Sequence, residues 1–292
     1  MALNIATFKT RAITAGDFVA VMLVGMLWNH WSFFILFSIV HFGCWIEYQK
    51  LVCLINKKYT TINPIHKYGV MIAGWCIMLY FTNDSFNIFG TTLYAMGAKA
   101  GFIAVIAVLV SELLLYKQFS LKNIGWSVFG LLYISLSLAL LVNLRCWGMT
   151  HKGQHSYFDF FGFVLPLGIL ISLWINDTMA YIVGSFIGKT PFSKISPKKT
   201  WEGTLGGAIL CIIVISLLGN WVVNNWKDWA IIAAIAAIAG TTGDLFESKL
   251  KRMAGVKDSG SIMPGHGGFL DRFDSLLFAA PCVWVYVILF MK

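Results

Sequence analysis

Long apolar stretches, separated by short polar segments, recur along the whole chain. They cover approximately residues 12–28, 31–55, 66–82, 93–116, 123–144, 157–187, 203–223, 228–250 and 274–291. A helix that crosses a membrane needs roughly 20 predominantly apolar residues. The pattern therefore predicts an all-α, polytopic integral membrane protein with about nine transmembrane helices.

The composition supports this interpretation. Of the 292 residues, 58% are hydrophobic and 12% are charged, and the mean hydropathy is +0.75. Soluble domains carry about 25% charged residues, so this chain has too few polar side chains to cover a water-soluble globule. The six cysteines form no C-x-x-C pair. We interpret them as small apolar residues and not as a disulfide or zinc framework.

The basic residues favour one orientation in the membrane. With a cytoplasmic N-terminus, about seventeen of the 22 Lys and Arg residues fall in cytoplasmic loops and four in external segments. Because Lys and Arg accumulate on the cytoplasmic side, we expect a cytoplasmic N-terminus and an external C-terminus. The net charge of +9 has the same explanation. The sequence contains no basic-aromatic stripe typical of nucleic-acid binding, so we expect no nucleic-acid partner.

The acidic residues are concentrated in the second half of the chain. Residues 171–275 contain eight of the thirteen Asp and Glu residues. Earlier spans contain few polar groups, and we interpret Glu47, beside Trp45 and Tyr48, as a residue at the membrane interface. We expect residues 1–170 to form a scaffold of transmembrane helices that contact lipid or a second subunit, and residues 171–292 to form the catalytic region.

The richest polar segment lies between two pairs of carboxylates. Asp244 and Glu247 are three residues apart and share one face of a helix, and Asp271 and Asp274 repeat that spacing. Carboxylates that converge repel one another unless a cation is present, and Mg²⁺ is typically held by one or two carboxylates together with substrate phosphates. Cations and glycines suited to phosphate binding lie between or beside the pairs: Lys249, Lys251, Arg252, Lys257, Arg272, Gly260, Gly265, Gly267 and Gly268. This pattern predicts phosphoryl or nucleotidyl transfer; the alternative for any single residue is a basic topological loop with structural ion pairs.

A second polar segment lies on the same expected side of the membrane. Asp177 stands between Asn176 and Thr178 inside an apolar stretch. Further along, hydroxyl groups and adjacent cations precede the next span in the run Ser196, Pro197, Lys198, Lys199 and Thr200. Such a loop before a helix N-terminus predicts a phosphate site, although lysines in a cytoplasmic loop also have a purely topological explanation.

These motifs resemble those of the phosphatidate cytidylyltransferases. The family signature has the form S-x-x-K-R-x4-K-D-x-[GSA]-x2-[LIF]-P-x-H-G-G-x-x-D-R-x-D, and Met263 departs from it where Leu, Ile or Phe is usual. The blocks N-D-T-x-A-Y, G-K-T-P, S-P-K-K-T-x-E-G and G-D-L-x-E-S are also similar to the family's, so the resemblance covers about residues 174–275. The signature positions are Ser248, Lys251, Arg252, Lys257, Asp258, Gly260, Pro264, His266, Gly267, Gly268, Asp271, Arg272 and Asp274.

The resemblance implies the reaction of CTP with phosphatidate to give CDP-diacylglycerol and pyrophosphate. It implies that Asp244 and Asp271 bind one or two cations, Mg²⁺ in the first place, and we add Asp274 as a third candidate ligand. It also implies a homodimer, and we expect a bacterial inner-membrane location with the active site facing the cytoplasm. Candidate residues for neutralising the substrate phosphates are Lys198, Lys199, Lys251, Arg252 and Arg272. Candidates for other substrate contacts are Ser196, Thr200, Lys257, Gly267, Gly268, Asp177 and Asp258, with His266 as a phosphate contact or weak proton carrier.

Two alternatives from other functional classes remain open on the sequence. A CTP-dependent kinase of a polyprenol lipid has similar needs for cations and basic loops. An ion-coupled transporter would use Asp177 and Asp244 to bind cations within the membrane. Transporters often contain repeated halves, and the sequence shows no such repeat.

Overall fold

The computed structural model describes residues 5–114, 120–150, 158–193, 195–261 and 267–291. Most of them are helical, and the one small sheet among them is the antiparallel pair β1 (Asn87–Ile88) and β2 (Thr91–Thr92). The first helices are α1 (Ile5–Leu27), α2 (His30–Ile55), the short 3-10 helix η1 (Lys57–Thr61), α3 (Pro64–Tyr80) and α4 (Leu93–Leu114). The remaining helices are α5 (Leu121–Gly130), the π-helical η2 (Leu131–Leu136), α6 (Ser137–Thr150), α7 (Phe158–Ile187), α8 (Trp201–Val223), α9 (Trp226–Met253) and α10 (Leu270–Phe290).

Every apolar stretch in the sequence coincides with a helix. Over the described residues, seven helical segments are both long and apolar enough to cross a membrane, and one of them is the continuous run of α5, η2 and α6. This confirms an all-α, polytopic membrane protein. The apolar part of α1 (Thr14–Leu27) and the 17-residue α3 are shorter. That these two helices also span the membrane, which would make nine spans, stays a prediction.

Asparagine and threonine side chains fix the starts of several helices. Asn29 caps α2 by accepting a hydrogen bond from the Ser32 N–H at 2.7 Å, and the Ser32 hydroxyl accepts one from the Asn29 N–H at 3.1 Å. Asn63 caps α3, which begins with Pro64, and Thr200 caps α8. Since the first N–H groups of a helix have no partner within it, these caps determine where each span begins.

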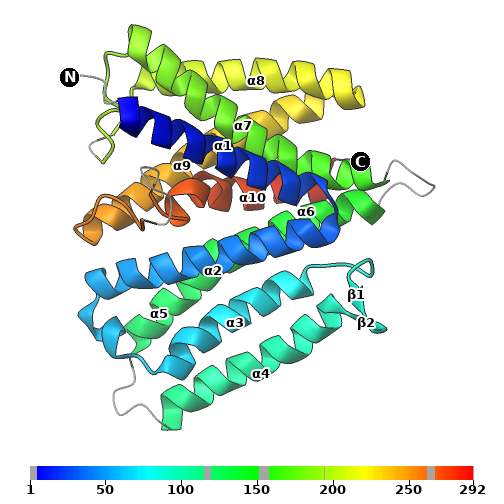
Figure 1. Cartoon of the computed structure of the whole chain (residues 1–292), viewed down its shortest axis with the longest axis vertical. Coiled ribbons are helices and arrows are strands. Elements are labelled where there is room, and N and C mark those ends of the chain that lie inside the picture. Colours follow the sequence, from blue (N-terminus) through cyan, green and yellow to red (C-terminus); the bar gives the residue numbers. More distant parts are fainter. Residues whose placement is uncertain (1–4, 115–119, 151–157, 194, 262–266, 292) are drawn as a thin grey trace.

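The helices run back and forth between two ends of the molecule. In Figure 1 helix α1 begins at the same end of the molecule as the segment between α2 and α3 and the start of α8, and α10 ends at the opposite end. Helices α3 and α4 pack together, as do α7 with α8 and α9 with α10, while α2 and α6 both contact α10. The expected division at residue 170 falls inside α7 and stays a prediction.

The interior is rich in aromatic and aliphatic side chains. Phe33, Phe37, Trp45 and Tyr48 of α2 are fully buried, and the Phe37 ring contacts that of Phe273 on α10 with centroids 6.4 Å apart. All six cysteines are free thiols, and four of them are buried. This core connects α2, in the first half of the chain, with the helix that carries the second pair of carboxylates.

Candidate active site

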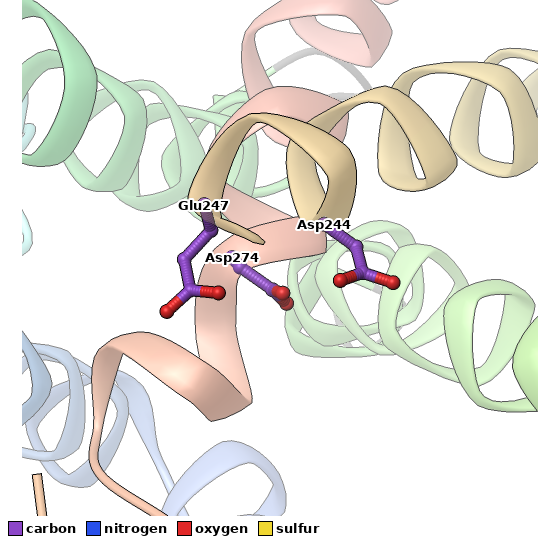
Figure 2. A group of neighbouring side chains, drawn as sticks. All are labelled: Asp244, Glu247 and Asp274. Atoms are coloured by element: carbon purple, nitrogen blue, oxygen red, sulfur yellow. The ribbon is translucent and has the colours of Figure 1, made fainter. Parts of the chain in front are cut away.

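Three carboxylates converge where α9 crosses α10. Asp244 and Glu247 project from one face of α9, and Asp274 projects from α10 towards them (Figure 2). One oxygen from each carboxylate lies within 4.8 Å of the others. The helices approach closely because Gly243 has no side chain: a β-carbon there would lie 2.5 Å from the backbone oxygen of Asp274. The structure thus brings together two of the three predicted metal ligands, Asp244 and Asp274.

Two lysines flank this carboxylate cluster of Asp244, Glu247 and Asp274. Lys199 forms an ion pair with Asp244. Lys251 lies 2.5 Å from Glu247 Oε2 and 2.6 Å from Asp271 Oδ1, so it connects the two pairs of carboxylates. Glu247 is fully buried, and its Oε1 has no hydrogen-bond partner among the described residues. A buried carboxylate oxygen without a donor is energetically costly, so this cluster suits an additional cation.

Asp271, the third predicted metal ligand, makes a different set of contacts. Its Oδ2 accepts hydrogen bonds from the Ser259 N–H at 2.9 Å and the Gly268 N–H at 2.8 Å, and the Ser259 hydroxyl lies 2.9 Å away. Its Oδ1 accepts one from Lys251. Gly267 has a φ of +82°, and a β-carbon there would lie 2.5 Å from Asp271 Oδ2. The structure therefore places Asp271 in the first turn of α10, beside the cluster and linked to it through Lys251.

A hairpin before α8 positions Lys199. The Phe192 N–H donates to the Lys199 backbone oxygen at 2.7 Å, and the Trp201 N–H donates to the Thr190 backbone oxygen at 2.9 Å. Glu202, at the start of α8, accepts hydrogen bonds from the Lys189 N–H at 3.1 Å and the Thr190 hydroxyl at 2.8 Å. The G-K-T-P and S-P-K-K-T-x-E-G blocks therefore form one hydrogen-bonded unit.

The other predicted residues differ in their surroundings. The side chains of Lys198, Arg252, Lys257, Asp258 and Arg272 are exposed. Within the hairpin, Thr200 caps α8 and the Ser196 backbone oxygen accepts from the Lys199 N–H at 3.1 Å. Asp177 on α7 is exposed and interacts electrostatically with Lys199 and Asp244. His266 lies outside the described residues.

The structure also contains site residues that the sequence reasoning missed. Glu247 was noted for its spacing from Asp244 but was not chosen as a ligand, although it completes the carboxylate cluster. Glu47, interpreted from the sequence only as a residue at the membrane interface, has a side chain that is 1% exposed and accepts hydrogen bonds from the segment before α10. Those donors include backbone N–H groups, which leave no signal in the sequence.

Comparison with known proteins places these features in a family. Residues 9–290 match the model of the cytidylyltransferase family. Among curated relatives, a phosphatidate cytidylyltransferase from Synechocystis is 36% identical over 60% of this chain and 66% of its own length. Phosphatidate cytidylyltransferase 4, chloroplastic, from Arabidopsis thaliana is 34% identical over 65% of this chain and 51% of its own length. A phosphatidate cytidylyltransferase from Aquifex aeolicus is 36% identical over 61% of this chain and 62% of its own length.

The matched region is less than two thirds of the length of each of these three relatives. The family model, in contrast, extends over nearly the whole chain, including the helices before the polar motifs. The carboxylates, the lysines and the hairpin all lie within that match. The chain belongs to the cytidylyltransferase family.

Proposed function

We propose that this protein transfers the cytidylyl group of CTP to phosphatidate, giving CDP-diacylglycerol and pyrophosphate. The observation that carries the proposal is the cluster of Asp244, Glu247 and Asp274 between Lys199 and Lys251, at the ends of membrane-length helices. A site at helix ends can receive a water-soluble nucleotide while the acyl chains of a lipid substrate stay in the bilayer. The relatives named phosphatidate cytidylyltransferase lend support.

The proposed reaction is an in-line substitution at phosphorus. A phosphate oxygen of phosphatidate bonds to the α-phosphorus of CTP, the bond from that phosphorus to the bridging oxygen breaks, and pyrophosphate leaves with the electron pair. A phosphate monoester is largely ionised near pH 7, since its second pKa is about 6, so the attack requires no strong base. The work of the protein is to orient the two substrates and to neutralise their charge.

The lysine and arginine side chains of the site have different proposed roles in this charge neutralisation. Lys199 and Lys251 are close to the carboxylate cluster, where they can contact phosphate oxygens nearest the reacting centre. Lys198, Arg252, Lys257 and Arg272 are exposed on the same polar segments, where they can attract an anionic nucleotide or a lipid headgroup. Hydrogen bonds from a charged group to phosphate stabilise the transition state most strongly where water is excluded, so we expect the larger contribution from Lys199 and Lys251.

We further propose that the cluster holds a divalent cation, Mg²⁺ in the first instance. Asp244, Glu247 and Asp274 offer oxygen ligands at compatible distances, and among the described residues the buried Glu247 has an oxygen without a hydrogen-bond partner, which would suit a cation. When bound, the cation would withdraw charge from the phosphates. Glu247 takes the place that the sequence reasoning gave to Asp271, whose oxygens receive hydrogen bonds from the chain itself.

The orientation is part of the proposal. Helix α10, whose first turns carry Asp271 and Asp274, begins at the end of the molecule where α1 and α8 also begin (Figure 1). The segments between helices on that side are rich in Lys and Arg, and the positive-inside rule assigns such a side to the cytoplasm. For a bacterial protein this means the inner membrane, where CTP is available. A homodimer stays a prediction.

The test uses the purified full chain in lipid vesicles that contain phosphatidate, with CTP labelled at either the α- or the γ-phosphate. We expect the α-label to enter the lipid, pyrophosphate to be released, and EDTA to abolish both until Mg²⁺ is restored. Transfer of the γ-label to a polyprenol lipid would instead identify a kinase. No transfer of either label to phosphatidate would refute the proposal.

A further inference from the structure

A buried carboxylate from the first half of the chain holds the loop that precedes α10. Glu47 lies on α2 and is 1% exposed. Its Oε1 accepts a hydrogen bond from the Phe269 N–H at 3.0 Å, and its Oε2 accepts one from the Leu270 N–H at 2.8 Å. The Ser259 hydroxyl lies 2.8 Å from Oε2. None of the motifs recognised in the sequence includes this residue.

These bonds replace a helix cap. Helix α10 begins at Leu270, and Phe269 before it has no side-chain cap of its own. The first N–H groups of a helix need acceptors, and a negative charge beside them is favourable because of the helix dipole. Glu47 supplies both acceptor oxygens and the charge from a different helix, so the start of α10 depends on α2.

Glycines allow this close contact. A β-carbon on Gly260 or on Gly268 would overlap the carboxylate of Glu47, and one on Gly43 of α2 would overlap the Phe269 ring. The carboxylate is therefore enclosed by the loop on both sides. A side chain held this tightly has little freedom to rotate, and the loop has little freedom to move away from it.

The hydrogen bonds around Glu47 extend to the candidate active site. The Ser259 hydroxyl lies between Glu47 and Asp271, within hydrogen-bond distance of both. Asp271 is in the first turn of α10, and Asp274, one turn later, belongs to the carboxylate cluster. A change in the direction of this first turn moves both aspartates relative to Asp244 and Glu247 on α9.

We propose that Glu47 is a positioning residue, which sets the start of α10 and thereby the placement of Asp271 and Asp274. The proposal rests on the function proposed above. Glu47 itself need not touch a substrate: it is separated from the cluster by Ser259 and Asp271. The carboxylate is required, because an amide presents one acceptor oxygen and would turn an NH₂ group towards a backbone N–H.

The experiment compares Glu47→Gln with wild type as purified, folded protein. We expect kcat for cytidylyl transfer to fall about 10- to 100-fold, since small misplacements of reacting groups have effects of that size, while KM for CTP changes less than about threefold. Hydrogen–deuterium exchange should detect the altered start of α10 directly, and this measurement does not depend on transferase activity. Loss of about one hydrogen bond predicts roughly tenfold faster exchange in peptides that cover residues 267–273.

Gln49→Leu is the matched control. Gln49 is also a buried polar residue of α2, but its amide donates to the Lys67 backbone oxygen at 2.9 Å and binds α2 to α3. We expect this variant to lower thermal stability while kcat and exchange at 267–273 stay within about twofold of wild type. If Glu47→Gln does not fold, Glu47→Asp is tested in its place, because it keeps the charge but has a shorter side chain. We expect it to lower kcat and to speed exchange at residues 267–273, in both cases by less than is expected for Glu47→Gln.

Unchanged exchange at 267–273 in the Gln variant, or in Glu47→Asp if only that variant folds, would overturn the proposal. A kcat loss equal to that of Gln49→Leu would also overturn it, because a general loss of stability would then suffice. Should wild type transfer no cytidylyl group, the proposed function fails. In that case the exchange data still decide whether Glu47 holds the start of α10.

Discussion

Lys251 offers a direct test of the electrostatics of the site through the substitution Lys251→Met. Its ammonium group pairs with Glu247 at 2.5 Å and with Asp271 at 2.6 Å, and its side chain is 12% exposed while that of Glu247 is 0% exposed. Methionine fills a similar volume without charge. The substitution therefore leaves Glu247 as a buried negative charge without its cation, next to Asp244 and Asp274.

The size of the effect follows from this geometry. With an effective dielectric constant of 20, charges 2.5 Å apart attract by about 7 kcal/mol before the cost of desolvating them is counted. Removal of one partner from a buried pair typically costs about 3–5 kcal/mol of stability. Asp271 contributes less to this loss, because its Oδ2 keeps hydrogen bonds from Ser259 and Gly268.

Equilibrium unfolding in mixed micelles, followed by the fluorescence of the 12 tryptophans, measures the loss. The control is the double variant Glu247→Gln with Lys251→Met, which removes both charges. We expect it to recover at least about 1 kcal/mol relative to Lys251→Met alone, since directly coupled residues are not additive. A Lys251→Met variant within about 1 kcal/mol of wild type, or a double variant less stable than the single one, would refute this reasoning.

Three further substitutions test the parts of the site separately. Asp271→Asn should abolish transfer while insertion into the membrane stays intact, because an amide removes the charge that pairs with Lys251 beside the cluster. Near-normal turnover in detergent would contradict a role for that ion pair in catalysis. Lys199→Ala should raise KM for CTP or phosphatidate by about 10- to 100-fold, the equivalent of one charged hydrogen bond; an unchanged KM for both would mean that the hairpin has only a topological function. Gly243→Ala should lower the free energy of unfolding by about 1–3 kcal/mol, and it should remove most of the activity because the added methyl group pushes Asp274 away. Gly125→Ala is the control, since its methyl group meets no atom within 4 Å, and its activity should be unchanged.

The hydrophobic pattern was sufficient to predict the helices because membrane spans depend on length and apolarity, which are local properties. The two carboxylate pairs could be recognised for a similar reason. Asp244 and Glu247 are one helical turn apart, so their common face follows from helix geometry alone. The hairpin that carries Lys199 was predicted only as a loop, since its form depends on Glu202 and on backbone hydrogen bonds.

The sequence could not reveal which carboxylates meet in space. Asp271 was expected beside Asp244, but the preceding loop supplies it with N–H donors, and it is Glu247 that lies in the cluster with Asp244 and Asp274. Glu47 could not be identified for the same physical reason. A glutamate among apolar residues has the same sequence pattern at a membrane interface and in a buried site, and its partners here are mainly backbone groups.

The charge balance of the site leads to one further expectation. Four carboxylates, those of Asp244, Glu247, Asp271 and Asp274, face two ammonium groups, those of Lys199 and Lys251. The exposed cations Lys198, Arg252, Lys257 and Arg272 can attract a triphosphate to the site. A phosphate group that comes next to the carboxylates, however, meets this local excess of negative charge and is repelled, unless a cation binds with it. On the proposed function, CTP and Mg²⁺ should therefore each tighten the binding of the other by the same factor. Calorimetric titration of CTP at several Mg²⁺ concentrations measures that factor, and a CTP affinity independent of Mg²⁺ would contradict the assignment of the cluster as the cation site.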